Sequence, residues 1–164
     1  MKLGMKHLAP YLPYVLKGKF ILDIDLVSGL NNEYDLVEPQ NGNAVELKDF
    51  APILRPLSDL NKEISFNGKK IIPFIEMAKI ECGDTDDAEI SYEIEEDDYT
   101  LFLEYLPSWF SLNYYKNSKK LARWDDGEGI EPCSNETLMK LYEYHFDMFG
   151  LIEKGLAIDI NTLK

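Results

Sequence analysis

The chain of 164 residues contains few of the side chains from which metal and redox sites are built. It has two cysteines and two histidines. Cys82 and Cys133 could pair, but two cysteines do not make a disulfide framework, and reduced, partly buried thiols are the simpler interpretation. The sequence contains none of the CxxC, HExxH, P-loop, dinucleotide-binding and GxSxG patterns. We therefore expect no cofactor, no metal ion and no enzyme activity.

Basic residues are also scarce, with 17 Lys and Arg against 30 Asp and Glu and a net charge of −13. Arg55 and Arg123 are the only arginines. A chain without a basic patch is poorly suited to neutralise nucleic-acid phosphates or to reach an anionic membrane. The sequence also lacks an apolar run long enough to span a bilayer and a cleavage site after its first residues. It predicts a cytoplasmic protein that contacts neither nucleic acid nor membrane directly.

Apolar and aromatic residues are present in ordinary amounts, at 45% and 12% of the chain. A chain of this length buries roughly 70% of its unfolded surface when it folds. We therefore expect a single domain spanning residues 1–164. Two sub-lobes are conceivable within it, a β-rich one over residues 1–80 and an acidic one over residues 81–164.

Short strands are predicted in the first half of the chain, after an extended lead-in over residues 1–16. Residues 20–27 alternate between apolar side chains and Asp23 and Asp25, as a half-buried strand does. Residues 34–38 and 44–48 resemble two more strands. Asn67-Gly68 between residues 64–66 and 69–72 is the strongest short hairpin signal. These strands predict a small antiparallel sheet, with an SH3-like barrel as one arrangement.

The second half combines a sheet with a helix. Pro73 suits the first position of a short helix over residues 73–80. Residues 88–124 alternate as an antiparallel meander, and residues 125–132 are interpreted as a polar linker. Apolar residues at three- and four-residue spacing then predict one amphipathic helix over residues 134–149, ended by Gly150. The predicted class is α+β, with this C-terminal helix packed on a sheet.

The most distinctive feature outside the predicted core is an acidic, aromatic stretch within the meander. Carboxylates along a sheet could imitate DNA phosphates and occupy a basic groove, but a charged face also keeps a sheet soluble and blunts its edges. Trp109 and Phe110 are adjacent, so a strand would place them on opposite faces, and one could be an exposed contact residue. The candidate interaction surface comprises Glu93, Glu95, Glu96, Asp97, Asp98, Trp109 and Phe110.

Two further patterns have simpler structural interpretations. His145 lies on the apolar helix face, and a catalytic or metal role would need a partner, yet His7 is the only other histidine. A packed, hydrogen-bonded histidine is favoured. The acidic residues 84–87 invite a calcium interpretation, but Glu89 stands where the EF-hand loop requires glycine. A solvated acidic loop is favoured there.

Three segments, residues 8–14, 51–60 and 144–160, resemble a family of small proteins encoded by phages and prophages of intestinal anaerobic bacteria. Family members carry Trp at the position of Tyr144, Val at that of Met148 and Gly near Val15. The resemblance implies a phage or prophage origin and the cytoplasm of a bacterial host, with association with virions left open. It carries over no catalytic residue.

The sequence therefore favours a phage-type accessory protein that binds a partner protein without catalysis. An acidic mimic of nucleic acid that inhibits a host protein is one alternative. A structural or assembly component and a small enzyme with a site hidden from sequence are the others. The partner, any ligand and the oligomeric state are not specified by the sequence.

Overall fold

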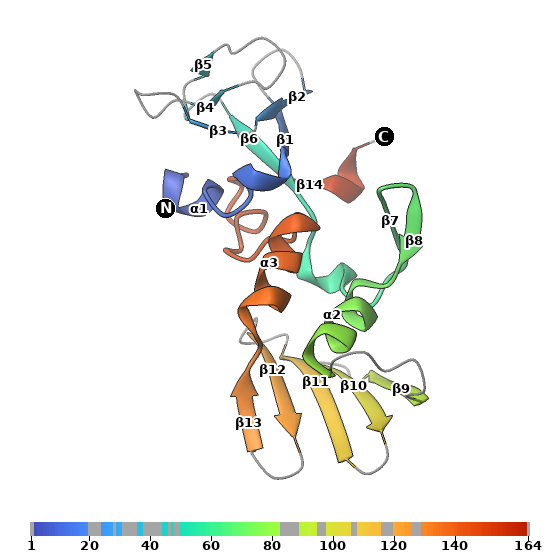
Figure 1. Cartoon of the computed structure of the whole chain (residues 1–164). Helices are drawn as coiled ribbons and strands as arrows, with labels where there is room; N and C mark the ends of the chain where they lie inside the picture. The colour runs from blue at the N-terminus through green and yellow to red at the C-terminus, as the bar shows by residue number, and fades with distance from the viewer. Residues whose placement is uncertain are drawn as a thin grey trace. The chain divides into compact units, whose positions relative to one another are not determined.

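A computed structural model describes residues 2–19, 24–27, 29–30, 36–37, 44–45, 47, 50–82, 89–94, 98–105, 108–115, 120–125 and 129–163 (Figure 1). The chain forms two compact units, one from residues 1–57 with 141–164 and the other from residues 58–140. Helices and mainly antiparallel strands occur together, so the class is α+β. Below, unit 1 is the one that contains both ends of the chain.

Unit 1 begins with two short helices, α1 (Met5–Leu8) and the 3-10 helix η1 (Leu12–Tyr14). The prediction of an extended lead-in over residues 1–16 is therefore wrong. Pro13 lies in the first turn of η1, where its fixed φ fits a helix and its missing N–H costs no hydrogen bond. The same proline that suggested extended chain thus starts a helical turn.

Two sheets follow in unit 1. The first has the order β14-β6-β1-β2, and the second is β3-β4-β5. β14 runs parallel to β6, and the other pairs are antiparallel. The strands are β1 (Leu16–Lys19), β2 (Ile24–Val27), β3 (Gly29–Leu30), β4 (Leu36–Val37), β5 (Ala44–Val45), β6 (Ala51–Leu54) and β14 (Ile158–Asp159), with the 3-10 helix η4 (Ile160–Thr162) after them. Over the described residues no closed barrel forms, so the SH3-like barrel is not confirmed.

The core of unit 1 joins the two ends of the chain. Its fully buried members include Leu8, Tyr11 and Leu16 from the first residues, Leu54 from β6 and Leu151 from the last segment. Tyr142 and Phe149 pack against this cluster, and Phe146 is fully buried. Segments more than 130 residues apart in sequence therefore share one apolar core.

Unit 2 follows the 3-10 helix η3 (Leu57–Asp59) and opens with a hairpin of β7 (Ile64–Phe66) and β8 (Lys69–Ile71). Asn67 and Gly68 both have positive φ, at 49° and 76°, as a type I′ turn requires, so the hairpin prediction is confirmed. The helix α2 (Pro73–Cys82) begins at Pro73 as expected. Its residues Phe74, Met77 and Ala78 are buried.

A five-stranded antiparallel sheet forms most of unit 2, with its strands side by side in the order β13-β12-β11-β10-β9 (Figure 1). The strands are β9 (Glu89–Ile94), β10 (Asp98–Tyr105), β11 (Ser108–Tyr115), β12 (Lys120–Asp125) and β13 (Gly129–Pro132). The meander is thus present, but residues 129–132, interpreted as linker, form its edge strand. Glu131 lies opposite Arg123, and this cross-strand ion pair favours strand over linker.

The last helix, α3 (Asn135–Glu143), is shorter than the predicted helix over residues 134–149. The chain leaves the helical path at His145, which has φ of 58°, and Phe146 forms a parallel bridge with Arg55. The Arg55 N–H donates to the His145 carbonyl at 2.8 Å, and the Asp147 N–H donates to the Arg55 carbonyl at 2.8 Å. Pairing with a distant segment therefore ends the helix before its apolar periodicity does.

Candidate protein-interaction face

The candidate site lies on one face of the five-stranded sheet, and the strand register defines it. Residues directly opposite each other in antiparallel strands share a face, and alternate residues along a strand do so too. Glu93 pairs with Thr100, Thr100 with Asn113, and Asn113 with Ala122. The acidic face, as we name this set, comprises Glu89, Ser91, Glu93, Asp98, Thr100, Phe102, Glu104, Trp109, Ser111, Asn113, Tyr115, Lys120, Ala122, Trp124, Ile130 and Pro132.

The opposite face is the apolar one, and α2 lies against it. Leu112 and Tyr114 belong to this face and are 0% and 3% exposed. α2 packs against β10 and β11. The carboxylate of Glu81, in the last turn of α2, lies 3.9 Å from the guanidinium of Arg123, which occupies the same face. One face of the sheet is therefore used for the core of unit 2, and the acidic face is turned away from it.

The structure separates the seven predicted contact residues. Glu93, Asp98 and Trp109 occupy positions on the acidic face. Phe110 pairs with Leu103 on the α2 side, so the two adjacent aromatics fall on opposite faces, as strand geometry requires. Glu95, Glu96 and Asp97 lie outside the described residues. The sheet thus places three of the predicted residues on one face, with Trp109 at the opposite end of the β10–β11 pair from Asp98, and adds Glu89 and Glu104, which pair directly with each other.

An exposed apolar pair at the other side of the same face was missed by the sequence reasoning. Trp124 on β12 and Ile130 on β13 are directly opposite each other and are 37% and 70% exposed. Ser111 and Ala122, which are small, are buried on this face, whereas Trp124 and Ile130 at the β12–β13 edge are exposed. Because residues 129–132 are interpreted as a linker in the sequence analysis, the pairing of Ile130 with Trp124 is not predicted there. The alternation of Ile130 with Glu131 is the local signal that would have revealed it.

The edge strand and α3 are held by a polar cluster around the buried carboxylate of Glu81. Arg123 donates to one oxygen of Glu131 from Nε at 3.1 Å and Nη2 at 2.5 Å. The backbone N–H and hydroxyl of Ser134 donate to Oε1 of Glu81 at 2.7 and 2.8 Å. The Ser134 hydroxyl also accepts the Thr137 N–H at 3.2 Å, which makes it the N-cap of α3. This cluster positions the strand that carries Ile130.

Cys133 lies beside the polar cluster as a free thiol. Burial raises the pKa of this thiol to about 12, with a further rise from the Glu81 carboxylate that the Arg123 charge partly opposes. A thiol with this pKa is protonated at neutral pH, and the protonated form is a poor nucleophile. The arrangement is that of a structural cysteine.

The surroundings of the two histidines of unit 1 are also those of residues with a structural role. Burial lowers the pKa of His145, a hydrogen bond with the Tyr14 backbone opposes this, and the Arg55 charge adds to the lowering. Nδ1 of His7 accepts the Gly4 N–H at 3.0 Å, and its ring lies edge-on to Phe149. His145 is therefore neutral at neutral pH and half-buried. This agrees with the packed histidine that the sequence favoured, although His145 follows α3 instead of lying within it.

Two polar side chains near these histidines, Tyr11 and Asp147, form hydrogen bonds with backbone groups of unit 1. The Tyr11 hydroxyl donates to the Phe146 carbonyl at 2.6 Å and accepts the Met148 N–H at 3.2 Å. The Asp147 carboxylate accepts the N–H groups of Leu151 and Ile152, both at 2.8 Å. Burial raises the pKa of Tyr11 far above its ordinary value. These groups fix the path of the last segment.

Among the described residues, no group of three or more His, Cys, Asp or Glu side chains is arranged to hold a metal ion. The acidic segment 84–87, considered for calcium, lies outside the described residues. None of the helices that the structure describes is long and apolar enough to cross a membrane.

A comparison of the chain with protein-family models, curated proteins and solved structures found no match.

Proposed function

We propose that the protein is a phage-type accessory protein that binds a partner protein through its acidic face, without catalysis. The observation that carries the proposal is the register of the sheet. It aligns Glu89, Glu93, Asp98 and Glu104 with Trp109, Trp124 and Ile130 on the face turned away from α2.

The composition of this face suits protein recognition. Exposed aromatic and branched apolar residues such as Trp124 and Ile130 supply contact energy at interfaces, where tryptophan is enriched among residues that dominate binding. Acidic positions on β9 and β10, across β11 on the same face, attract a basic partner and orient it during the encounter. Lys120 is the one basic residue at the described positions of this face. The partner we expect therefore presents an apolar depression bordered by Lys and Arg.

Mimicry of nucleic acid is a second candidate for the same face. It is favoured by the acidic positions at β9 and β10, where Glu89 and Glu104 stand directly opposite each other. Like charges at such a pair destabilise a sheet, so their presence on one face suits a purpose other than folding. A mimic would bind a host protein that itself holds nucleic acid. A structural or assembly component is the third candidate and would associate with copies of itself or with virions.

The test is affinity capture from a lysate of an intestinal anaerobic bacterium, followed by titration of the retained protein. We compare the wild type with E93Q/D98N, with W124A and with I130T, which keeps a β-branched residue. The control E63Q/E136Q removes the same charge from exposed carboxylates away from the acidic face.

We expect the wild type and the control to retain one partner and W124A to weaken it by about thirtyfold, as loss of a dominant interface residue does. E93Q/D98N is expected to slow association and reduce its dependence on salt. Equal retention by all variants, or a blank at both 50 and 500 mM salt, would overturn the proposal. Displacement of the partner by DNA would establish mimicry, and a stable homo-oligomer in light scattering would favour the assembly component.

A further inference from the structure

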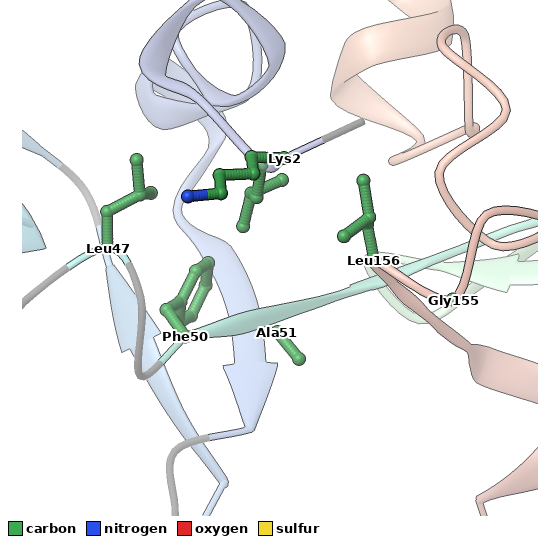
Figure 2. Close-up of a pocket in the computed structure, with 7 residues that line it drawn as sticks. Lys2, Leu47, Phe50, Ala51, Gly155 and Leu156 are labelled. Atoms are coloured by element: carbon green, nitrogen blue, oxygen red, sulfur yellow. The ribbon is translucent and has the colours of Figure 1, made fainter.

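Unit 1 contains a pocket of about 610 Å³ that belongs to none of the sites described above. It lies between the first residues of the chain, the start of β6 and the turn at Gly155 (Figure 2). Its lining residues are Lys2, Leu3, Leu47, Phe50, Ala51, Gly155 and Leu156. The volume falls within the range of pockets that hold small organic molecules, about 300–1,000 Å³.

The walls of the pocket are parts of the folded core. Phe50 is 4% exposed and packs directly on Gly18 of β1, since a Cβ at Gly18 would come within 1.9 Å of its ring carbon Cε2. Leu3, Leu47 and Leu156 pack against the same core cluster. Gly155 has φ of 66°, a left-handed conformation that lets the chain turn beside Leu156. The pocket is therefore shaped by packing that exists without a ligand.

Among the described residues that line the pocket, Lys2 is the one with a charge and the others are apolar or glycine. In Figure 2 the ammonium of Lys2 lies on the same side of the pocket as Leu47 and Phe50. Within the described part of the chain, no hydrogen bond or ion pair involves Lys2. A cation that has no carboxylate partner among the described residues and lies beside an apolar pocket is complementary to a ligand with one negative charge and an apolar body.

We propose that this pocket binds the anion of a medium-chain fatty acid. The alkyl chain lies against Phe50, Ala51 and Leu156, and the carboxylate pairs with the Lys2 ammonium. Each buried methylene contributes about 0.8 kcal/mol, which corresponds to roughly a fourfold gain in affinity. Affinity is therefore expected to rise from hexanoate through octanoate to decanoate and to stop rising once the chain outgrows the pocket.

The test is a titration of the full-length ¹⁵N-labelled protein with these three carboxylates, below the concentrations at which they form micelles, and with 1-decanol. We expect decanoate to shift the amide signals of Leu47, Phe50, Ala51 and Leu156 and to bind at least tenfold more tightly than decanol. An absence of shifts at millimolar decanoate, or shifts confined to residues outside this lining, would overturn the proposal. Equal affinity for decanoate and decanol would overturn the part played by Lys2.

Two variants separate the head group from the chain. K2M is expected to reduce decanoate affinity about tenfold and to leave decanol unchanged, whereas K6M, which alters an exposed lysine on α1, changes neither. L156W adds bulk to the pocket from the turn after Gly155 and is expected to weaken the binding of both ligands. Wild-type affinity in L156W would contradict the site. The pocket lies in unit 1 and the acidic face in unit 2. A protein that does not bind decanoate could therefore still bind a partner protein through the acidic face, and a protein that binds no partner could still bind decanoate.

Discussion

Val15 has a backbone conformation that branched residues rarely adopt. It follows η1 with φ of 56° and ψ of 75°, in the left-handed region, and its N–H closes the turn on the Leu12 carbonyl at 3.2 Å. The left-handed region costs an L-residue with a side chain roughly 1–2 kcal/mol, because Cβ crowds the following carbonyl. Glycine, which has no Cβ, is the residue that this conformation favours.

Replacing Val15 with Gly is therefore expected to stabilise the protein. The relief of strain exceeds the added entropy of the unfolded chain, which leaves a gain of roughly 0.5–1 kcal/mol in the free energy of unfolding. Urea denaturation of the two proteins measures this difference. The control is Ala9→Gly. Because Ala9 has right-handed helical angles, its replacement by glycine should lower the free energy of unfolding by up to about 1 kcal/mol. An unchanged or lower stability of the Val15 variant would show that the conformation carries no strain.

Tyr11 and Asp147 illustrate a residue-scale feature that periodicity does not reveal. Both are buried, and both use their polar atoms to bind backbone groups of residues 146–152. A buried polar group without a hydrogen-bond partner destabilises a fold by about 1–3 kcal/mol, so partners of this kind are required. Their identity depends on which segments meet, and sequence spacing does not contain that information.

At the scale of elements, the end of α2 and the start of α3 are joined by one carboxylate. The side chain of Glu81 is 0% exposed, and it accepts two hydrogen bonds from Ser134 at the N-terminus of α3. A negative charge there is favoured by the helix dipole. Arg123 lies nearby on the sheet and pairs with Glu131 of the edge strand. Two helices and the edge strand thus depend on a single polar cluster.

Ser134→Ala is expected to destabilise unit 2 by about 2–3 kcal/mol, because it removes the helix cap and one hydrogen-bond donor of a buried carboxylate. Chemical denaturation followed by circular dichroism gives the difference in the free energy of unfolding. Ser134→Thr keeps the hydroxyl and should lose less than about 1 kcal/mol. Equal losses in both variants would mean that the hydroxyl does not hold the cluster together.

At the scale of the whole molecule, unit 1 is discontinuous in sequence. The chain leaves it after residue 57 and returns at residue 141, and unit 2 is formed by the residues between. The returning segment supplies β14, the bridge between Phe146 and Arg55, and the buried side chain of Leu151. Unit 1 is therefore incomplete without the last residues of the chain.

Deletion of residues 144–164 is expected to unfold unit 1 and to leave unit 2 folded. Loss of the buried Phe146 and Leu151 alone removes about 3–6 kcal/mol, comparable to the whole stability of a small domain. Amide hydrogen exchange should show that Leu54 loses protection while Leu112 in the sheet keeps it. Deletion of residues 160–164, which removes η4, is the control and should leave both protected. If Leu54 kept its protection in the longer deletion, unit 1 would not depend on residues 144–164 for its fold.

Local signals predicted much of the secondary structure. The hairpin at Asn67-Gly68, the helix beginning at Pro73 and the meander each follow from chemistry within a few residues. The extended lead-in and the long final helix were wrong because distant contacts decide those segments: Arg55 pairs with Phe146 where the apolar pattern would continue the helix. Of the predicted contact residues, Glu93, Asp98 and Trp109 share one face through the strand register, and the exposed pair of Trp124 and Ile130 likewise depends on strand pairing.

The sequence by itself determined the α+β class, the acidic balance and the hairpin turn at Asn67-Gly68, because composition and short-range sterics act within a few neighbouring residues. Only the tertiary structure decided that both ends of the chain build one core and that a pocket opens between them at Lys2 and Leu156. It also decided that the acidic positions of β9 and β10 share a face of the sheet with the exposed apolar pair of Trp124 and Ile130. These features depend on how segments far apart in sequence pack together and on the register of their strands. The burial of apolar surface selects that arrangement, and no local sequence pattern specifies it.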